Sequence, residues 1–264
     1  MGNDISRENK NMAKVTVCGI RFDDLNADEA VRRVLRDDCE AQTVVTPNAL
    51  IAEACASNPA YRRLVNSASL VLPDGVGIAS AARRQGTPLR GRVAGIDFGE
   101  RLLAEAAKRG ERVFLLGGRD GVAPAAAENL KKKFPGLCVC GCFWGYFDRH
   151  GEENRRLLGI INACKPSILL VCFGFPIQEE WIRENVGFLP SVRVAAGLGG
   201  SLDVWAGRVR RAPAAVRAVR MEWAWRMLQK PGRVRQLPAL FRFRAISRKA
   251  ATNSAKTHTE SKIP

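Results

Sequence analysis

Ser69-Leu70-Val71-Leu72-Pro73-Asp74-Gly75-Val76-Gly77-Ile78 contains the three parts of one folding unit. The short apolar run predicts a buried strand, the Pro-Asp-Gly sequence predicts a turn, and the Ala-rich segment that follows predicts a helix. We therefore expect Asp74 at the carboxyl end of a strand, where open parallel α/β sheets bind their ligands. Because Pro-Asp-Gly is also an ordinary turn sequence, this stretch alone leaves Asp74 between a turn residue and a catalytic carboxylate.

The same succession of strand, turn and helix recurs along most of the chain. Strands are expected at residues 15–20, 43–46, 69–72, 112–116, 137–142, 167–173 and 192–196, with helices between them. This order predicts an α/β fold with a Rossmann-like, mostly parallel sheet and helices on both faces. A length of 264 residues suits one large domain of this kind with an appendage.

Positive charge is concentrated near the C-terminal end of the chain. The formal net charge is +16, and from residue 201 onward there are 15 Lys or Arg against 3 Asp or Glu. We expect a flexible leader at 1–13, an α/β core at 14–200, a basic helical appendage at 201–248 and a disordered tail at 249–264. Such a basic appendage predicts an anionic partner, either nucleic acid or phospholipid headgroups. Its Trp, Phe and Arg residues suit a bilayer interface, although the apolar ones could equally pack on the core.

Cysteine, histidine and the apolar runs exclude several classes of protein. The eight cysteines are scattered without a CxxC pair, and Cys138, Cys140 and Cys142 are expected as strand residues rather than metal ligands. No apolar segment of a secretory signal occurs near the N-terminus, so a reduced, cytoplasmic protein is expected. The longest apolar run, residues 168–175, is far below the roughly 20 residues that span a bilayer. With only two histidines, one of them in the expected tail, a Ser-His-Asp hydrolase is not expected.

Polar residues follow several of the expected strands. Thr46 and Asn48 come after the second strand, where their side chains could bind a ligand or cap the next helix. Arg92 lies in the Gly-rich segment 86–97, where a guanidinium fork suits a phosphate or a carboxylate as well as it suits solvent. Gln178 begins a helix after the most apolar strand, and it either contacts a ligand or simply occupies the first helical turn.

Six stretches, taken in order, carry a resemblance to a known family. They are Thr46-Pro47-Asn48, Pro73-Asp74-Gly75, Arg92-Val93-Ala94-Gly95 with Asp97, Leu115-Leu116-Gly117-Gly118, residues 174–179, and Arg211-Ala212-Pro213 followed by Glu222-Trp223 and Arg226. From about residue 15 to 240 the chain resembles the WecG/TagA/CpsF glycosyltransferases, glycosyltransferase family 26. It departs from the family's Gly-x-Pro-Lys-Gln-Glu sequence at Ile177, which replaces the lysine.

The resemblance implies an inverting transfer between two membrane-pathway substrates. An N-acetylmannosamine-type sugar would move from a UDP donor to undecaprenyl-diphosphate-linked N-acetylglucosamine, for teichoic acid or other surface polysaccharide. The protein would be cytoplasmic and peripheral on the inner face of the cell membrane, with its basic appendage on anionic lipid. No Asp-x-Asp sequence occurs in the chain. We therefore expect no metal and no other cofactor.

The resemblance also gives roles to single residues. Asp74 would be the general base that takes the proton from the acceptor hydroxyl. Residues that match positions lining the family's substrate pocket are Thr46, Asn48, Arg92 and Gln178. Arg92 would meet charge on a diphosphate. Candidates for the lipid diphosphate are Arg226, Arg233 and Arg235.

Two other classes of function remain as alternatives. A nicotinamide or flavin enzyme could use the same sheet, but no GxGxxG follows the first expected strand. A nucleic-acid-binding protein would use the basic C-terminal segment, whereas the resemblance implies a membrane surface and no nucleic acid. Apolar surface around an undocked appendage could also support self-association into a homo-oligomer.

Overall fold

The computed structural model describes residues 14–36, 41–213, 215–216, 224–225, 229 and 231–260, without the side chains of residues 231, 233 and 253–260. These residues form two compact units, and each unit is discontinuous in sequence. The first is made of the described residues within Met1–Asn26, Thr46–Ala94 and Gln236–Pro264, and the second of the described residues within Ala27–Val45 and Gly95–Arg235. The boundary expected at residue 200 therefore does not separate the two units.

Parallel strand pairing organises the second unit. Its strands lie in the order β3 (Gln42–Val45), β8 (Val194–Gly197), β7 (Ile168–Cys172), β5 (Arg112–Gly117) and β6 (Cys138–Phe143). All four pairings between these neighbours are parallel, for example Leu115 opposite Leu170. Every residue of β7 and β8 is buried, as expected for parallel strands covered on both faces.

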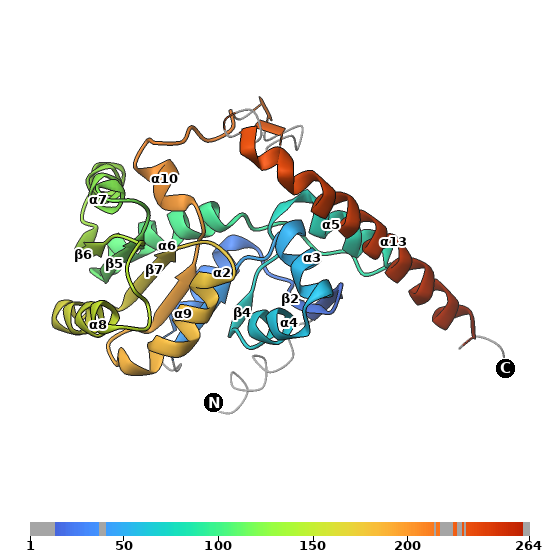
Figure 1. Ribbon diagram of the computed structural model, residues 1–264, viewed down its shortest axis with the longest axis horizontal. Helices are drawn as coiled ribbons and strands as arrows, with labels where there is room; N and C mark the ends of the chain where they lie inside the picture. The colour runs from blue at the N-terminus through green and yellow to red at the C-terminus, as the bar shows by residue number, and fades with distance from the viewer. Residues whose placement is uncertain are drawn as a thin grey trace, which may run out of the picture. The chain divides into compact units, whose positions relative to one another are not determined.

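Helices cover both faces of this sheet. They are α2 (Ala27–Val34), α6 (Gly95–Arg109), α7 (Val122–Lys133), α8 (Glu152–Cys164), α9 (Ile177–Asn185) and α10 (Ser201–Trp205), with the 3₁₀ turn η1 (Val186–Phe188) after α9. Figure 1 shows α8 and α9 on one face and α7 on the other. Leu157 of α8 and Trp181 of α9 are buried in one cluster with Phe114 and Val171 of the strands. The prediction of an α/β fold with a parallel sheet between helices is therefore confirmed.

The first unit combines a hairpin with packed helices. Its elements are β1 (Lys14–Val17), β2 (Ile20–Asp23), α3 (Ala49–Ser57), α4 (Pro59–Asn66), β4 (Leu70–Val71), α5 (Gly75–Arg84) and α13 (Leu237–Glu260). Asp23, only 1% exposed, accepts a hydrogen bond from the backbone nitrogen of Val71 at 2.9 Å and so links the hairpin to β4. A short 3₁₀ helix, η2 (Pro231–Gln236), precedes α13.

The single strand expected at residues 15–20 is wrong. β1 and β2 pair antiparallel, and Cys18 and Gly19 turn the chain between them with φ of 51° and 80°. Positive φ at both central positions is the geometry of the tightest hairpin turns, and glycine adopts it without strain. The apolar pattern continues across this turn, which is why the residues resemble one strand.

The tail expected from residue 249 is also corrected, because α13 continues to Glu260. No Gly or Pro follows Pro238 within the helix, so nothing in its sequence interrupts it. Phe243 and Ser247 of α13 are buried, and the helix packs on α3 and α5. Gly77 of α5 permits this packing, because an added Cβ would lie 3.0 Å from the Cβ of Ala49 and 3.4 Å from Phe243.

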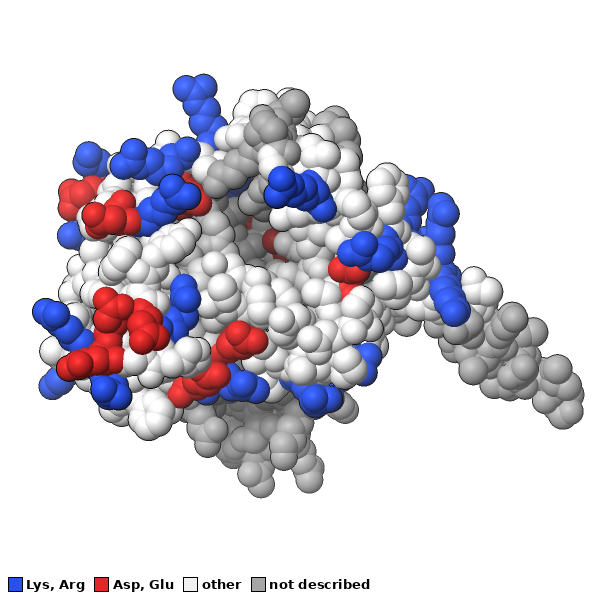
Figure 2. All heavy atoms as spheres, viewed as in Figure 1, with Lys and Arg blue, Asp and Glu red and all other residues white. Residues whose placement is uncertain are grey.

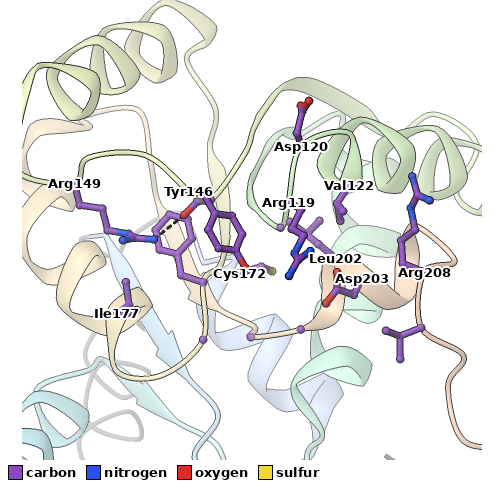
Figure 3. Close-up of a pocket in the computed structure, with 17 residues that line it drawn as sticks. Arg119, Asp120, Val122, Tyr146, Arg149, Cys172, Ile177, Leu202, Asp203 and Arg208 are labelled. Carbon is purple, nitrogen blue, oxygen red and sulfur yellow. Dashed lines mark hydrogen bonds between the residues drawn. The ribbon is translucent and has the colours of Figure 1, made fainter. Parts of the chain in front are cut away.

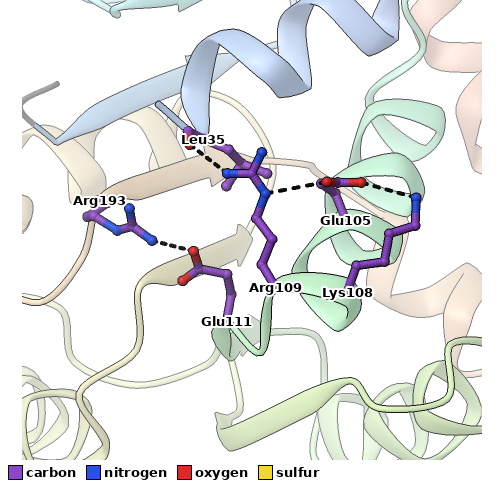
Figure 4. A network of polar contacts seen from close by, with 6 residues as sticks. All are labelled: Leu35, Glu105, Lys108, Arg109, Glu111 and Arg193. Atoms are coloured by element: carbon purple, nitrogen blue, oxygen red, sulfur yellow. Dashed lines mark hydrogen bonds and ion pairs between the residues drawn. The ribbon is translucent and has the colours of Figure 1, made fainter. Parts of the chain in front are cut away.

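The amino-terminal edge of the sheet is tied together by a polar network (Figure 4). Glu111, just before β5, accepts hydrogen bonds from Ser167, just before β7, and from Arg193, just before β8. Partial burial alone would raise the pKa of the Glu111 carboxyl, but these hydrogen bonds and the Arg193 charge outweigh it and lower the pKa. The network therefore favours the ionised carboxylate.

We predict that Glu111→Gln lowers the free energy of unfolding near pH 7 by about 1–3 kcal/mol, because Arg193 and Ser167 lose an ionised acceptor. A carboxyl whose pKa is lowered by folding stabilises the fold above its unfolded pKa, and this contribution is lost as the pH falls through the folded pKa. Urea unfolding at pH 7 and pH 4 should therefore show a gap between the two proteins that narrows in acid. Glu105→Gln on the surface of α6 is the control. The prediction is contradicted if Glu105→Gln loses as much stability as Glu111→Gln, or if the loss in Glu111→Gln does not depend on pH.

Candidate active site

Three of the predicted stretches meet in the first unit. The backbone nitrogen of Asp74 donates to the carbonyl oxygen of Pro47 at 3.1 Å, and that of Val93 donates to the carbonyl oxygen of Pro73 at 2.8 Å. These bonds join the loop of Thr46 and Asn48, the loop of Asp74 and the loop of Arg92. Residues far apart in sequence are thus held on neighbouring loops.

Asp74 lies at the N-terminus of α5, which places a carboxylate where the helix dipole favours negative charge. Its side chain is half-buried and makes no capping hydrogen bond to α5. The turn at Gly75 has a φ of 82°, which glycine adopts without strain. The structure therefore gives Pro-Asp-Gly a turn while keeping the Asp74 carboxylate out of the cap.

Asn48 caps α3. Its side-chain oxygen accepts hydrogen bonds from the backbone nitrogens of Leu50 and Ile51 at 3.0 and 3.2 Å. These bonds fix the side chain through its oxygen and do not use its amide nitrogen. Asn48 can therefore cap the helix and still donate a hydrogen bond to a ligand. Thr46, half-buried, lies two residues before this cap.

The two arginines of the Gly-rich segment differ in their surroundings. Arg90 pairs with Asp24, and its backbone nitrogen donates to the Asp24 carboxylate at 2.8 Å. Arg90 thus anchors the segment to the residue after β2. Arg92, two residues later, is half-buried on the loop that bonds to Pro73.

A pocket of about 680 Å³ lies in the second unit, at the carboxyl ends of the strands (Figure 3). Its walls come from the loops that follow β5, β6, β7 and β8, and they include Gly118, Gly145, Gly174 and Gly199. The chain leaves β5 toward β6 and leaves β7 toward β8, in opposite directions. Adjacent strands of this kind form a topological switch point, where α/β sheets characteristically bind ligands.

Gln178 joins two of these loops. It is 4% exposed, and its side-chain oxygen accepts hydrogen bonds from the backbone nitrogens of Gly174 at 3.1 Å and Gly199 at 2.9 Å. Its amide nitrogen donates to Glu179 at 2.9 Å. The described contacts of Gln178 therefore hold the pocket wall, and whether it also contacts a ligand remains a prediction.

Glu179, which accepts this hydrogen bond from Gln178, is buried. Burial is the main cause that raises the pKa of its carboxyl to about 7, against the opposing hydrogen bond from Gln178. Its second carboxylate oxygen has no partner among the described residues. The carboxyl is therefore largely protonated below neutral pH.

The predicted lipid-diphosphate residues are only partly described. Arg226 lies outside the described residues, and of Arg233 only the backbone, in η2, is described. Arg235 is exposed.

A different basic cluster lies in the first unit, where Arg83 and Arg84 of α5 are near Arg244 and Arg248 of α13. Figure 2 shows basic side chains gathered over these helices. Partial desolvation and the charges of Arg244 and Arg248 lower the pKa of Arg84, which also donates to Ser80 and Ser247 at 2.9 Å. This basic cluster brings four guanidinium groups together.

The described residues contain neither a metal-binding cluster nor a membrane-spanning helix. No three His, Cys, Asp or Glu side chains in this part of the chain come together as a metal site. Burial raises the pKa of the Cys140 and Cys142 thiols, which disfavours the thiolate that binds metals. None of the described helices is both long and apolar enough to cross a bilayer.

Several pocket residues were not predicted from the sequence. The segment after β6 contributes Tyr146, 60% exposed, and the half-buried Arg149, and the segment after α10 contributes Arg208. The available signal was a run of aromatic residues and glycine just after a strand, at 143–147. Arg119 lies in the Gly-rich turn after β5, which does suggest phosphate binding.

The fold is that of an α/β protein, and the joined loops of Asn48, Asp74 and Arg92 contain the motifs by which the chain resembles one glycosyltransferase family. Residues 15–256 match the glycosyl transferase WecG/TagA/CpsF family, and the chain belongs to this family. One relative is the N-acetylglucosaminyldiphosphoundecaprenol N-acetyl-beta-D-mannosaminyltransferase of Bacillus spizizenii, 34% identical over 84% of each chain. A protein of the same name from Staphylococcus aureus is 32% identical over 94% of this chain and 98% of its own length.

We predict that Glu179→Gln stabilises the protein at alkaline pH. An acid whose pKa is raised by folding destabilises the fold progressively as the pH rises from its unfolded to its folded pKa, here from about 4.5 to about 7. Glutamine keeps an acceptor for Gln178 without this cost, so the variant should gain on the order of 2–3 kcal/mol at pH 8 and much less at pH 5. Urea unfolding at both pH values checks this prediction. Equal stabilities at pH 8 would contradict it, and Glu180→Gln in the same turn is the control.

Proposed function

We propose that this protein transfers an N-acetylmannosaminyl residue from a UDP donor to undecaprenyl-diphosphate-linked N-acetylglucosamine, with inversion at the anomeric carbon. The observation that carries the proposal is the similarity, over most of both chains, to two proteins whose names state this acceptor and this transferred sugar. The meeting of the Asp74, Asn48 and Arg92 loops supports it, because these loops contain the residues that the chain shares with the family's motifs.

In the proposed reaction, the Asp74 carboxylate takes the proton of the acceptor hydroxyl as that oxygen attacks C1 of the donor sugar. The bond from C1 to the diphosphate breaks on the opposite side, and UDP leaves with the electron pair. The N-terminus of α5 supports this role because it favours the ionised form that a base requires. Arg92 is proposed to meet diphosphate charge, with Thr46, Asn48 and Gln178 as further substrate-binding residues.

The pocket of the second unit is proposed to bind the donor nucleotide. Its volume is within the usual range of small-molecule sites, and its glycine loops allow backbone nitrogens to approach phosphate oxygens. Arginine and backbone donors would then do the work that a divalent ion does in many nucleotide-sugar enzymes. This assignment agrees with the absence of Asp-x-Asp from the sequence.

We predict acceptor-dependent release of UDP when the purified protein is given UDP-N-acetylmannosamine and a lipid-diphosphate-linked N-acetylglucosamine. Asp74→Asn should reduce turnover by about 100-fold or more, because general base catalysis is lost, while its unfolding curve stays close to wild type. EDTA should leave the rate unchanged.

A panel of other UDP-sugars extends this assay to donor specificity. Transfer only from another sugar would overturn the donor, and near-normal turnover by Asp74→Asn would reject the base. Loss of rate in EDTA would reject metal independence. UDP release without acceptor would indicate hydrolysis rather than transfer.

We also propose that the protein associates peripherally with the anionic inner face of the cell membrane. The basic cluster of α5 and α13 supports this, as does Phe241 of α13, which is 68% exposed. Each basic residue near such a surface contributes on the order of 1 kcal/mol. Exposed aromatic and basic side chains on one helix are typical of interfacial binding.

We predict that Arg244→Gln combined with Arg248→Gln weakens binding to phosphatidylglycerol vesicles in flotation, whereas neutral vesicles bind neither protein. Arg155→Gln with Arg156→Gln removes the same charge from the surface of α8 and should have a smaller effect. An equal effect of the two pairs would reject the basic cluster as the contact. Tight DNA binding without vesicle binding would favour the nucleic-acid alternative.

A further inference from the structure

The pocket of the second unit contains three arginines in different settings. Arg119 and Arg208 are exposed on the loops after β5 and α10. Arg149, on the segment after β6, is half-buried. A charge that is partly removed from water interacts more strongly with a ligand than an exposed one, so Arg149 differs in kind from the other two.

Arg149 is held in place by both the backbone and aromatic rings. One terminal nitrogen donates to the carbonyl oxygen of Gly145 at 2.6 Å. The guanidinium carbon lies 4.9 Å from the ring centre of Phe173 and 5.5 Å from that of Phe147. The centres of these two rings, which we call the aromatic platform, are 5.8 Å apart. Phe173 also contacts the buried Trp181, so the platform packs against the core. The guanidinium is therefore ordered before any ligand binds.

The charge of Arg149 is not neutralised within the described part of the chain. Among the described residues it contacts one carbonyl oxygen and two aromatic rings, and none of the ion pairs between described residues includes it. Its Nε is buried without a partner among the described residues. A half-buried guanidinium with a buried, unpartnered N–H group is stabilised when an anion accepts from it, so the setting indicates a ligand with negative charge.

Ile177 gives the pocket an uncharged side chain near Arg149. It forms part of the same pocket wall, and Figure 3 shows it on the same side of the pocket as Arg149. An isoleucine here supplies no charge, so the first turn of α9 adds no cation beside Arg149. Asp120 and Asp203 come from the loop after β5 and from α10, on the other side of the pocket in Figure 3.

We propose that Arg149 binds the diphosphate of the nucleotide in this pocket. The inference deepens the proposed function and rests on it. A planar guanidinium on an aromatic platform presents its remaining N–H groups in a fixed direction, which suits two phosphoryl oxygens. The same contact favours the negative charge that develops on UDP as the sugar bond breaks, so Arg149 assists departure of the leaving group.

The test compares the binding of UDP and of uridine to the full-length protein by calorimetric titration, or by competition where uridine binds weakly. Arg149→Gln should weaken UDP binding about 10- to 100-fold, the usual worth of a charge-assisted hydrogen bond, and leave uridine binding unchanged. Arg156→Gln, an exposed arginine of α8 outside the pocket, should bind both ligands like wild type.

Each result decides a separate point. UDP binding by Arg149→Gln equal to wild type would overturn the inference. An equal loss for uridine would also overturn it, because Arg149 would then support the nucleoside or the pocket shape. Failure of the wild-type protein to bind UDP, while Arg156→Gln and wild type unfold alike, would instead reject the nucleotide donor of the proposed function.

Discussion

Parallel pairing is the constraint on which the second unit depends. Because β5, β7 and β8 run in the same direction, the loops that follow them emerge at one edge of the sheet. The strands also approach closely there: a Cβ at Gly117 would lie 2.5 Å from the carbonyl oxygen of Cys172. At Gly197 an added Cβ would meet the Gln178 amide at 2.8 Å. Glycine at these positions lets the strand ends approach closely and leaves room for the Gln178 side chain, which bonds to the loops of Gly174 and Gly199. These loops form part of the pocket wall.

The two edges of this sheet do different work. At the amino-terminal edge, the charged groups of Glu111 and Arg193 satisfy one another, so that edge stabilises the fold. At the carboxyl edge, backbone groups bond to Gln178 and an arginine rests on aromatic rings without a carboxylate among its described contacts. Paired charge suits stability, whereas charge held in place without a counter-ion suits recognition. This contrast is a physical reason to look for a ligand at one edge and not at the other.

Much of the fold was predictable because the sequence patterns are local. The expected strands at 112–116 and 167–173 agree closely with β5 and β7, since apolar runs bounded by turns leave few alternatives. The hairpin turn at Cys18 was not recognised, because its apolar pattern continues across the turn. The extent of α13 was not predicted either, since its burial depends on α3 and α5, which no local pattern in residues 237–260 reveals. Thr46, Asp74 and Arg92 were predicted as site residues from short stretches that follow strands or lie in Gly-rich loops, and they stay predictions. Arg149 was missed because its setting is created by Phe147 and Phe173, which come from separate loops.

The packing of α13 has a consequence for the order in which the protein can form. Arg242 pairs with Glu53 across 189 residues, and Ser247 meets Arg84 across 163. The first unit therefore cannot be completed during synthesis until residues 242–247 have left the ribosome, whereas every strand of the second unit has been made by residue 197. Long-range contacts of this kind close slowly because their loop entropy must be overcome first. The helix that contributes Arg244 and Arg248 to the basic cluster is thus the last described element to be synthesised, so the cluster itself is complete only after this helix has packed on α5.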